Sequence, residues 1–299
     1  MTTSIPFGRR STADQVLAGI DLTGKRIIVT GCNSGLGLET LNAFAANGAS
    51  VIGLARTLES ASRACAEASP ACVPVACDLA DLDSIAAAVR AIRALPVPLD
   101  AIVANAGVAS LPSLRTRYGV ELQFLTNHIG HFMLVNGLID QVRDGSGRIV
   151  IVSGSISPAP SEGIMFDNLD GRRFYQPAIF YAQSKLANAL YAKELSRRLR
   201  SRGIAVNAAD PGAARTRLTQ GFAARLFAKS PAQAAATQAL LAASPHAAGA
   251  TGEYWRNCKI SHGNVLLDDM ALAGRLWDIS RQILERRQPV ADPSLQRAA

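Results

Sequence analysis

Short apolar runs alternate with amphipathic stretches along most of the chain. Between Ile27 and about Asn207, each run of strand length is followed by a segment with the periodicity of a helix. An apolar run without polar alternation is typical of a strand that is buried on both faces of a parallel sheet. The pattern therefore predicts an α/β fold, in which repeated β-α units surround one parallel sheet.

The first of these units carries a glycine-rich turn. Residues 25–29 are predicted to form a strand, and residues 38–48 are predicted to form a helix that Gly48 closes. Glycines let the backbone approach a pyrophosphate, and the following helix N-terminus offers free N–H groups and a positive dipole end. The turn therefore predicts a dinucleotide site, whose binding residues are Gly31, Asn33, Ser34, Gly35, Leu36 and Gly37.

The end of the second predicted strand, residues 49–55, indicates which dinucleotide binds. Proteins of this architecture that bind NAD carry an acidic residue about 20 positions after the glycines, where it holds the ribose 2′-hydroxyl. Here that place holds Ala55, and Arg56 follows it. A guanidinium can bind a 2′-phosphate with two hydrogen bonds, whereas a carboxylate would repel it. We therefore expect NADP(H) to be preferred over NAD(H); a solvated arginine at a strand end is the alternative.

Tyr181 and Lys185 stand four residues apart in a predicted helix, so their side chains share one face. A phenol has a pKa of about 10, and a nearby ammonium lowers that pKa. The phenol can then exchange a proton with an alcohol or a carbonyl. The same spacing occurs often by chance as a surface contact. Downstream of a nucleotide motif, however, the pair predicts an acid–base site.

Composition and charge exclude two classes of function. The chain has 299 residues, 48% of them apolar, and a net charge of +8. Its basic residues are spread out and are densest between Arg197 and Arg202, at the end of a predicted helix, where cations stabilise the helix dipole. No basic platform interleaved with aromatic residues indicates a nucleic-acid partner. No apolar stretch reaches the ~20 residues that cross a bilayer, so we expect no integral membrane segment.

The cysteines and histidines predict neither disulfides nor a metal. The chain has five cysteines: Cys32, Cys65, Cys72, Cys77 and Cys258. Their number is odd, and their spacing is not that of metal ligands. The N-terminus lacks the apolar segment of a secretory signal, so we expect a reducing, cytoplasmic location. His128 and His131 invite a metal interpretation, but no carboxylate or third histidine joins them.

Together these motifs resemble those of the short-chain dehydrogenase/reductase family, and the resemblance extends through most of the chain. Asp78-Leu79 is similar to the family's adenine-edge contact, and Asn105-Ala106-Gly107 to its fourth-strand motif, which lines the cofactor. Asn127 falls where the family has a helix asparagine that holds a water beside the lysine. Pro211-Gly212, with Thr216, resembles the loop that meets the nicotinamide carboxamide.

Residues 127–132, 252–259 and 273–278 resemble the retinol-dehydrogenase-like and WW-domain-oxidoreductase-like branch of that family. The resemblance implies a single Rossmann-type fold, a doubly wound, mostly parallel seven-stranded sheet flanked by helices. We expect this domain to span residues 23–285. An N-terminal arm of residues 1–22 precedes it, and a flexible C-terminal tail of residues 286–299 follows.

One position departs from the family's pattern. The family ends its fifth strand with two serines, and the second bonds the substrate oxygen. Here the strand at residues 148–152 continues as Ser153-Gly154-Ser155. Without a gap the catalytic position falls on Gly154, which has no hydroxyl. A shift of one residue puts Ser155 there, which we favour, and Ser153 is the other candidate because alternate residues of a strand share a face.

The resemblance implies a hydride transfer between NADP(H) and a carbonyl or alcohol. Tyr181 would act as general acid and base, and Lys185 would lower its pKa and hold the nicotinamide ribose. A serine would polarise the substrate oxygen, and Asn127 would anchor a water that links Lys185 to solvent. Two alternatives stay open: a non-catalytic NADP-binding sensor or scaffold, and a double-bond reductase of the protochlorophyllide-reductase type.

Two stretches that contain several large apolar side chains indicate the class of substrate. Residues 157–180 contain Ile164, Met165, Phe166, Phe174 and Tyr175, and residues 218–230 contain Phe222, Leu226 and Phe227. An apolar lid over the substrate cleft would suit a small hydrophobic carbonyl or alcohol. A packed loop and an ordinary amphipathic helix are the alternative. The sequence is also compatible with a homo-oligomer.

Overall fold

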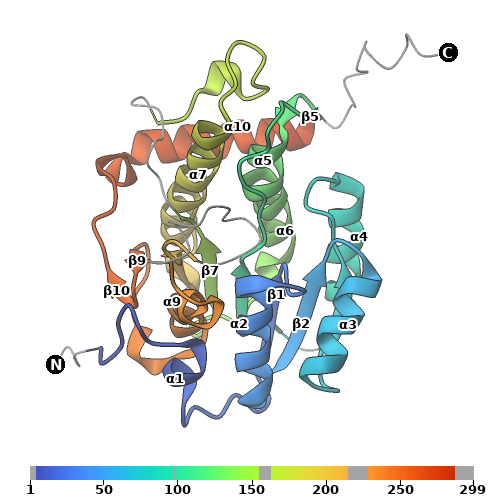
Figure 1. Ribbon diagram of the computed structural model, residues 1–299, viewed down its shortest axis with the longest axis vertical. Helices are drawn as coiled ribbons and strands as arrows, with labels where there is room; N and C mark the ends of the chain where they lie inside the picture. Colours follow the sequence, from blue (N-terminus) through green and yellow to red (C-terminus); the bar gives the residue numbers. More distant parts are fainter. Residues whose placement is uncertain (1–4, 97, 155–162, 215–227, 287–299) are drawn as a thin grey trace.

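The computed structural model describes residues 5–96, 98–154, 163–214 and 228–286 (Figure 1). Its centre is an eight-stranded sheet with the order β10-β9-β8-β7-β4-β1-β2-β3. Seven neighbouring strands are parallel: β1 (Arg26–Thr30), β2 (Ser50–Ala55), β3 (Val73–Ala76), β4 (Ala101–Ala104), β7 (Arg148–Val152), β8 (Ala205–Asp210) and β9 (Tyr254–Arg256). The predicted doubly wound, mostly parallel sheet is confirmed.

The predicted count of seven strands is wrong by one short edge strand. β10 (Lys259–Ile260) pairs with β9 in antiparallel orientation. The two residues between them, Asn257 and Cys258, have φ angles of 55° and 58°. Two consecutive positive φ angles are characteristic of the tight turn that joins two hairpin strands. A strand of two residues has no hydrophobic pattern of its own, so the sequence did not indicate it.

Helices cover both faces of the sheet. One face carries α1 (Ala13–Leu17), α2 (Gly35–Ala46), α3 (Leu58–Ala68) and α9 (Pro231–Ala243). The other carries α4 (Leu82–Arg93), α6 (Gly130–Leu138), α7 (Pro177–Arg198) and α10 (Met270–Glu285). A short α5 (Leu122–Phe124) leads into α6 through a π-helical turn, Leu125–Ile129, and Figure 1 shows α10 crossing α7. A separate hairpin joins β5 (Thr116–Arg117) to β6 (Val120–Glu121).

The two apolar layers explain why the strands read as continuous apolar runs. Ile27 packs into the layer beneath α2 and α9, whereas Ile28 packs into the layer beneath α4 and α7, and both are buried. Successive side chains of a strand point to opposite faces, so a strand that is covered on both sides needs apolar residues at every position. No helix among the described residues is both long and apolar enough to cross a bilayer.

The two ends of the chain are described in part. α1 packs against α9 and α2, and Thr12 and Gln15 form a reciprocal cap at its start. α10 ends at Glu285, and residues 287–299 lie outside the described residues. The division into an arm of residues 1–22, a domain of residues 23–285 and a tail of residues 286–299 stays a prediction.

Candidate functional site

A cavity of about 1650 Å³ opens at the carboxyl edge of the parallel strands. The strand order reverses between β4 and β1, and ligands of open α/β sheets bind at such a point. The residues predicted to bind a dinucleotide line this cavity: Gly31, Asn33, Ser34, Gly35, Leu36, Gly37, Arg56, Asp78, Leu79, Asn105, Ala106, Gly107, Tyr181, Lys185, Pro211 and Gly212. Thr216 lies outside the described residues.

The glycine turn is built so tightly that side chains would not fit. Gly31 has a φ of 69°, and a Cβ on it would lie 3.0 Å from the Cα of Ala106. A Cβ on Gly37 would lie 2.1 Å from the carbonyl oxygen of Gly31. Ser34, at the start of α2, makes no side-chain cap, whereas Thr57 caps α3. The first N–H groups of α2 are therefore left for an anion in the cavity.

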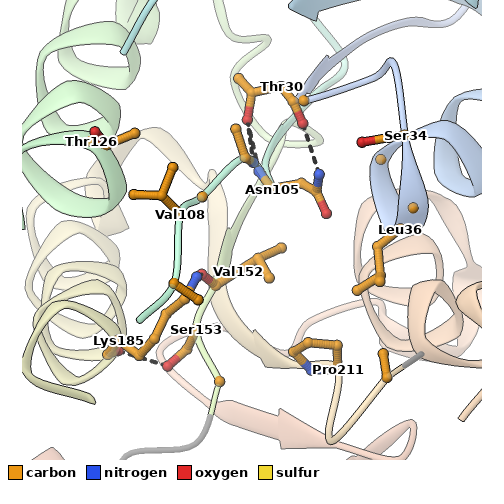
Figure 2. A pocket seen from close by; sticks show the side chains of 18 of the residues that line it. Thr30, Ser34, Leu36, Asn105, Val108, Thr126, Val152, Ser153, Lys185 and Pro211 are labelled. Carbon is orange, nitrogen blue, oxygen red and sulfur yellow. Dashed lines mark hydrogen bonds between the residues drawn. The ribbon is translucent and has the colours of Figure 1, made fainter. Parts of the chain in front are cut away.

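Thr30 and Asn105 connect the glycine turn to the end of β4. The Thr30 hydroxyl accepts the backbone N–H groups of Asn105 at 2.8 Å and Ala106 at 2.9 Å. The Asn105 side-chain amide donates to the Thr30 carbonyl at 2.8 Å, and Figure 2 shows the bonds between Thr30 and Asn105 on the cavity wall. These three hydrogen bonds fix the glycine turn relative to the end of β4.

The two histidines of the 127–132 run are structural. His131 Nδ1 lies 2.9 Å from the carbonyl oxygen of Asn127, which can only accept, so Nδ1 carries the proton and Nε2 accepts the Thr30 hydroxyl at 2.9 Å. Burial lowers the pKa of His131 to about 4, so the ring is neutral at pH 7. His128 Nε2 lies 2.8 Å from Ser280 Oγ. Within the described part of the chain, His, Cys, Asp and Glu form no group of three that could hold a metal.

α7 carries Tyr181 and Lys185 on the face that lines the cavity. It starts at Pro177, since proline fits the first turn of a helix. The Lys185 ammonium lies 5.7 Å from the centre of the Tyr181 ring and donates to the Val152 carbonyl at 3.2 Å. Ser153 Oγ donates to the Lys185 carbonyl at 2.7 Å, as Figure 2 shows. These bonds clamp the helix to the end of β7.

Burial shifts the pKa values of both residues of this pair. Burial raises the pKa of Tyr181 to about 12, and the carboxylate of Asp210 acts in the same direction. Burial lowers the pKa of Lys185 to about 8, against the opposing influence of Asp210. The predicted lowering of the Tyr181 pKa by Lys185 stays a prediction; in the protein alone, desolvation has the largest influence on the pKa of the phenol. At neutral pH the phenol keeps its proton.

Gly154 occupies the position that faces the phenol. A Cβ on Gly154 would lie 3.4 Å from the Tyr181 hydroxyl oxygen and 3.5 Å from Lys185 Cγ. Ser153 is 1% exposed, and its hydroxyl proton is committed to the backbone of α7. Ser155 lies outside the described residues. Among the described residues, the position beside the Tyr181 hydroxyl is thus Gly154, which has no hydroxyl, and the choice of Ser155 as the catalytic serine stays a prediction.

Asn127 lies behind the cavity wall, where its side chain hydrogen-bonds to Val108 and Ser184. Its side-chain amide donates to the Val108 carbonyl and to Ser184 Oγ, both at 2.9 Å, and its side-chain oxygen accepts the Val108 N–H at 2.8 Å. A Cβ on Gly107 would lie 3.1 Å from that oxygen and 3.5 Å from Lys185 Nζ, so the asparagine is close to the lysine. Asn127 sits in the π-helical turn, a feature that is frequent at functional sites. The predicted water stays a prediction.

The predicted apolar lid does not form the described wall. Ile164 is buried in the core, the Arg275 guanidinium covers Phe166 at 4.3 Å, and Tyr175 donates its hydroxyl to the Leu111 carbonyl at 2.7 Å. None of these side chains, nor Met165 or Phe174, lines the cavity. For the described residues 163–180, the packing of Ile164, Phe166 and Tyr175 favours the alternative of a packed loop, although Phe174 is 48% exposed. Phe222, Leu226 and Phe227 lie outside the described residues.

Sequence reasoning missed the C-terminal wall of the cavity. Asp210, Tyr254 and Arg256 line it, and Asp210 is the register partner of Arg256 across the β8–β9 pair. A signal existed only for Asp210, which directly precedes the predicted Pro211-Gly212 loop. Thr57, which caps α3, and Ser60, in the first turn of α3, also line the cavity near Arg56 and were missed.

Comparisons with known proteins agree with this geometry. The family model described as short chain dehydrogenase matches residues 25–166. The chain is 34% identical to human (Homo sapiens) retinol dehydrogenase 14, over 86% of this chain and 85% of that protein. It is 36% identical to the WW domain-containing oxidoreductase of Pongo abelii, over 96% of this chain and 74% of that protein. The crystal structure of an uncharacterized protein from Mycobacterium Paratuberculosis superposes with a TM-score of 0.74 at 29% identity, covering 90% of this chain and 97% of that one.

Proposed function

This chain belongs to the short-chain dehydrogenase family, in its retinol-dehydrogenase-like branch, and on that premise we propose that it is an NADP(H)-dependent oxidoreductase acting on a carbonyl or alcohol. Members of this family use a nicotinamide cofactor, which supplies the hydride. The observation that carries the proposal is that Tyr181 and Lys185 share the cavity of the glycine turn. A proton donor and a dinucleotide cradle in one cavity are what a carbonyl reduction requires.

The residues present fit such a cofactor. The uncapped N-terminus of α2 offers N–H groups to a pyrophosphate, and the close contacts at Gly31 and Gly37 leave no room for side chains in the turn. From there the cavity extends to Arg56 at the end of β2 in one direction and to Pro211-Gly212 after β8 in the other. Asp78 and Leu79, after β3, would contact the adenine edge, and residues 105–107 would line the path between the two ends.

The protein itself supplies the proton and the charge. In the reducing direction Tyr181 would donate its proton to the oxygen of the substrate carbonyl as negative charge develops there. With its pKa raised to about 12, the phenol is fully protonated at neutral pH. Lys185, with a pKa of about 8, is mostly an ammonium at pH 7 and would stabilise the phenolate that remains. Lys185 is 4% exposed, so this charge acts with little screening by water.

The glycine at position 154 favours one rival, a protein that binds NADP without catalysis. Without a hydroxyl facing Tyr181, the described site offers one donor fewer to the substrate oxygen. Measuring NADPH oxidation with a panel of aldehydes and ketones separates the two functions. Turnover to an alcohol supports the oxidoreductase, tight NADPH binding without turnover supports the sensor or scaffold, and a saturated carbonyl product would indicate a double-bond reductase.

Arg56→Gln should weaken NADPH binding by about ten- to a hundredfold and leave NADH binding nearly unchanged. The guanidinium lines the cavity at the end of β2, and a hydrogen bond to a charged group contributes roughly 1.5–3 kcal/mol. Adding Ala55→Asp should move the preference towards NADH. Fluorescence titration of both cofactors measures these changes. Arg63→Gln is the matched control, because Arg63 is an exposed residue of α3 that pairs with Glu59. Equal losses for both cofactors would mean that Arg56 is structural.

Lys185→Met should abolish turnover yet raise the stability of the cofactor-free protein at pH 7, by roughly 1–3 kcal/mol. The folded-state pKa of Lys185, about 8, lies below its ordinary value of 10.5, so the cost of burying the ammonium is fully present below pH 8. That cost disappears as pH rises from 8 to 10.5, and the advantage of the variant should shrink with it. Asn188 also donates to the Val152 carbonyl, at 3.0 Å, so the substitution should leave that carbonyl with a partner. Urea unfolding at pH 7 and pH 10 tests this, and a variant less stable than wild type at pH 7 would contradict it.

Location and substrate are also part of the proposal. The five cysteines are free thiols, in keeping with a reducing cytoplasm. A small hydrophobic carbonyl or alcohol is the proposed substrate, and a homo-oligomer stays a prediction.

A further inference from the structure

The end of the cavity beneath β9 is polar, although the predicted substrate is apolar. Arg256 and Asp210 face one another across the β8–β9 pair, and both line the cavity. Ser261 and Asn264, from the segment that follows β9, line the same end. None of these four residues belongs to a predicted dinucleotide motif, so their polarity requires another explanation.

Asp210 is satisfied without Arg256. Its carboxylate is 4% exposed and accepts the Tyr254 hydroxyl at 2.9 Å and the Gly212 N–H at 2.7 Å. Arg256 Nε lies 3.5 Å away, longer than a good charged hydrogen bond. The Arg256 side chain is 55% exposed, and this is its one ion pair within the described residues. Its two terminal nitrogens therefore remain to bind a ligand.

Lys229 adds a second cation beneath this end of the cavity. It is 5% exposed, and its ammonium has no hydrogen-bond partner among the described residues. A Cβ on Gly212, a residue of the cavity wall, would lie 3.7 Å from that ammonium. Arg256 is a permanent cation, and although burial lowers the pKa of Lys229, an anion held nearby would favour the charged form of that lysine. A buried ammonium without a partner is costly, so an anion held here would be stabilised.

The place of β9 in the sheet puts Arg256 far from Arg56, the predicted ligand of the 2′-phosphate, and nearer to Tyr181 and Lys185. Neighbouring strands lie about 4.8 Å apart, and β9 is five places from β2, so Arg256 is on the order of 24 Å from Arg56. β9 is two places from β7, whose end holds Lys185, a separation on the order of 10 Å. A substrate that reacts at Tyr181 can therefore extend to Arg256.

We propose that Arg256, with the buried Lys229 behind the cavity wall, binds a carboxylate on the substrate, which makes the substrate an oxo acid or hydroxy acid. A guanidinium holds a carboxylate with two parallel hydrogen bonds, and the buried ammonium adds a point charge. The carbonyl or alcohol group then lies at Tyr181. This assignment rests on the proposed function and names the substrate class for the same site.

Binding of unreactive acids tests the assignment without turnover. The protein saturated with NADP+ is titrated with hexanoate, octanoate and decanoate, and with the corresponding primary amides, in a calorimeter. Wild type should bind the best acid about ten- to a hundredfold more tightly than its amide, the range expected of charged hydrogen bonds. Arg256→Gln should remove that preference, and Lys229→Met should reduce it. Lys259→Gln should keep it, since Lys259 is an exposed residue of β10 opposite Arg256.

Three outcomes would overturn the assignment: equal binding of acid and amide by wild type, an acid preference that survives in Arg256→Gln, or a loss of NADPH affinity in that variant in place of the loss for acids. The last result would assign the guanidinium to a cofactor phosphate. An acid preference in a protein that reduces no carbonyl would overturn the proposed function alone. Turnover of neutral carbonyls without an acid preference would overturn the carboxylate site alone.

Discussion

Tyr181→Phe should lower kcat for carbonyl reduction by about 10²–10⁴-fold, the usual contribution of a general acid, while the Kd for NADPH stays nearly unchanged. The substitution removes the hydroxyl and leaves the ring, whose centre lies 5.7 Å from the Lys185 ammonium. Steady-state kinetics and fluorescence titration measure the two quantities on one preparation. Since only the proton donor is lost, the effect should appear in kcat rather than in cofactor binding.

Tyr175→Phe provides the matched control for this substitution. Tyr175 donates its hydroxyl to the Leu111 carbonyl and does not line the cavity, so its variant should keep nearly full activity. If Tyr181→Phe retained most of its activity, another group would have to supply the proton. The assignment of Tyr181 as the general acid would then be wrong.

Gly154→Ser should raise kcat, by on the order of tenfold or more, because it adds a hydroxyl where the described site has none. A single oxyanion-hole donor contributes about 10²–10³-fold in another enzyme class. The new Cβ would lie 3.4 Å from the Tyr181 oxygen and 3.5 Å from Lys185 Cγ, which are ordinary contact distances. Gly154 is not among the residues with a positive φ, so a side chain there adds no backbone strain.

Gly154→Ala separates the hydroxyl from the volume that carries it. A gain for serine over alanine, measured as kcat with a fixed carbonyl substrate, would show that the hydroxyl was missing. Equal activity of the serine and alanine variants would mean that another group, such as Ser155, already polarises the substrate oxygen. A large loss in both would mean that the space beside Tyr181 is needed by the substrate.

Signals that are local in the sequence predicted much of the fold and the centre of the site. The glycine turn could be located because strand, turn and helix follow one another directly, and Tyr181 and Lys185 could be paired because four residues make about one helical turn. The strand β10 could not be predicted, since it exists only through the turn at Asn257 and Cys258.

Features that depend on burial or on distant strands were missed. Arg256 reaches the cavity because β9 pairs with β8, and nothing in the local sequence indicates that pairing. The raised pKa of Tyr181 likewise arises from the desolvation of α7 against β7, whereas the spacing of Tyr181 and Lys185 indicated only their attraction. The sequence left Gly154, Ser155 and Ser153 open, and only the direction of the missing Gly154 side chain shows that position 154 lies beside the Tyr181 hydroxyl.

The most direct test of the proposed oxidoreductase is the transfer of deuterium to a carbonyl substrate from NADPH that carries deuterium at both hydrogen positions of nicotinamide C4. Mass spectrometry of the product after incubation with wild type, Tyr175→Phe and Tyr181→Phe measures the transfer. We predict an alcohol that carries one deuterium atom at the former carbonyl carbon with the first two proteins, and almost none with Tyr181→Phe. Tight NADPH binding with no deuterium in any product, across aldehydes, ketones and oxo acids, would contradict the account and leave a protein that binds the cofactor without using it.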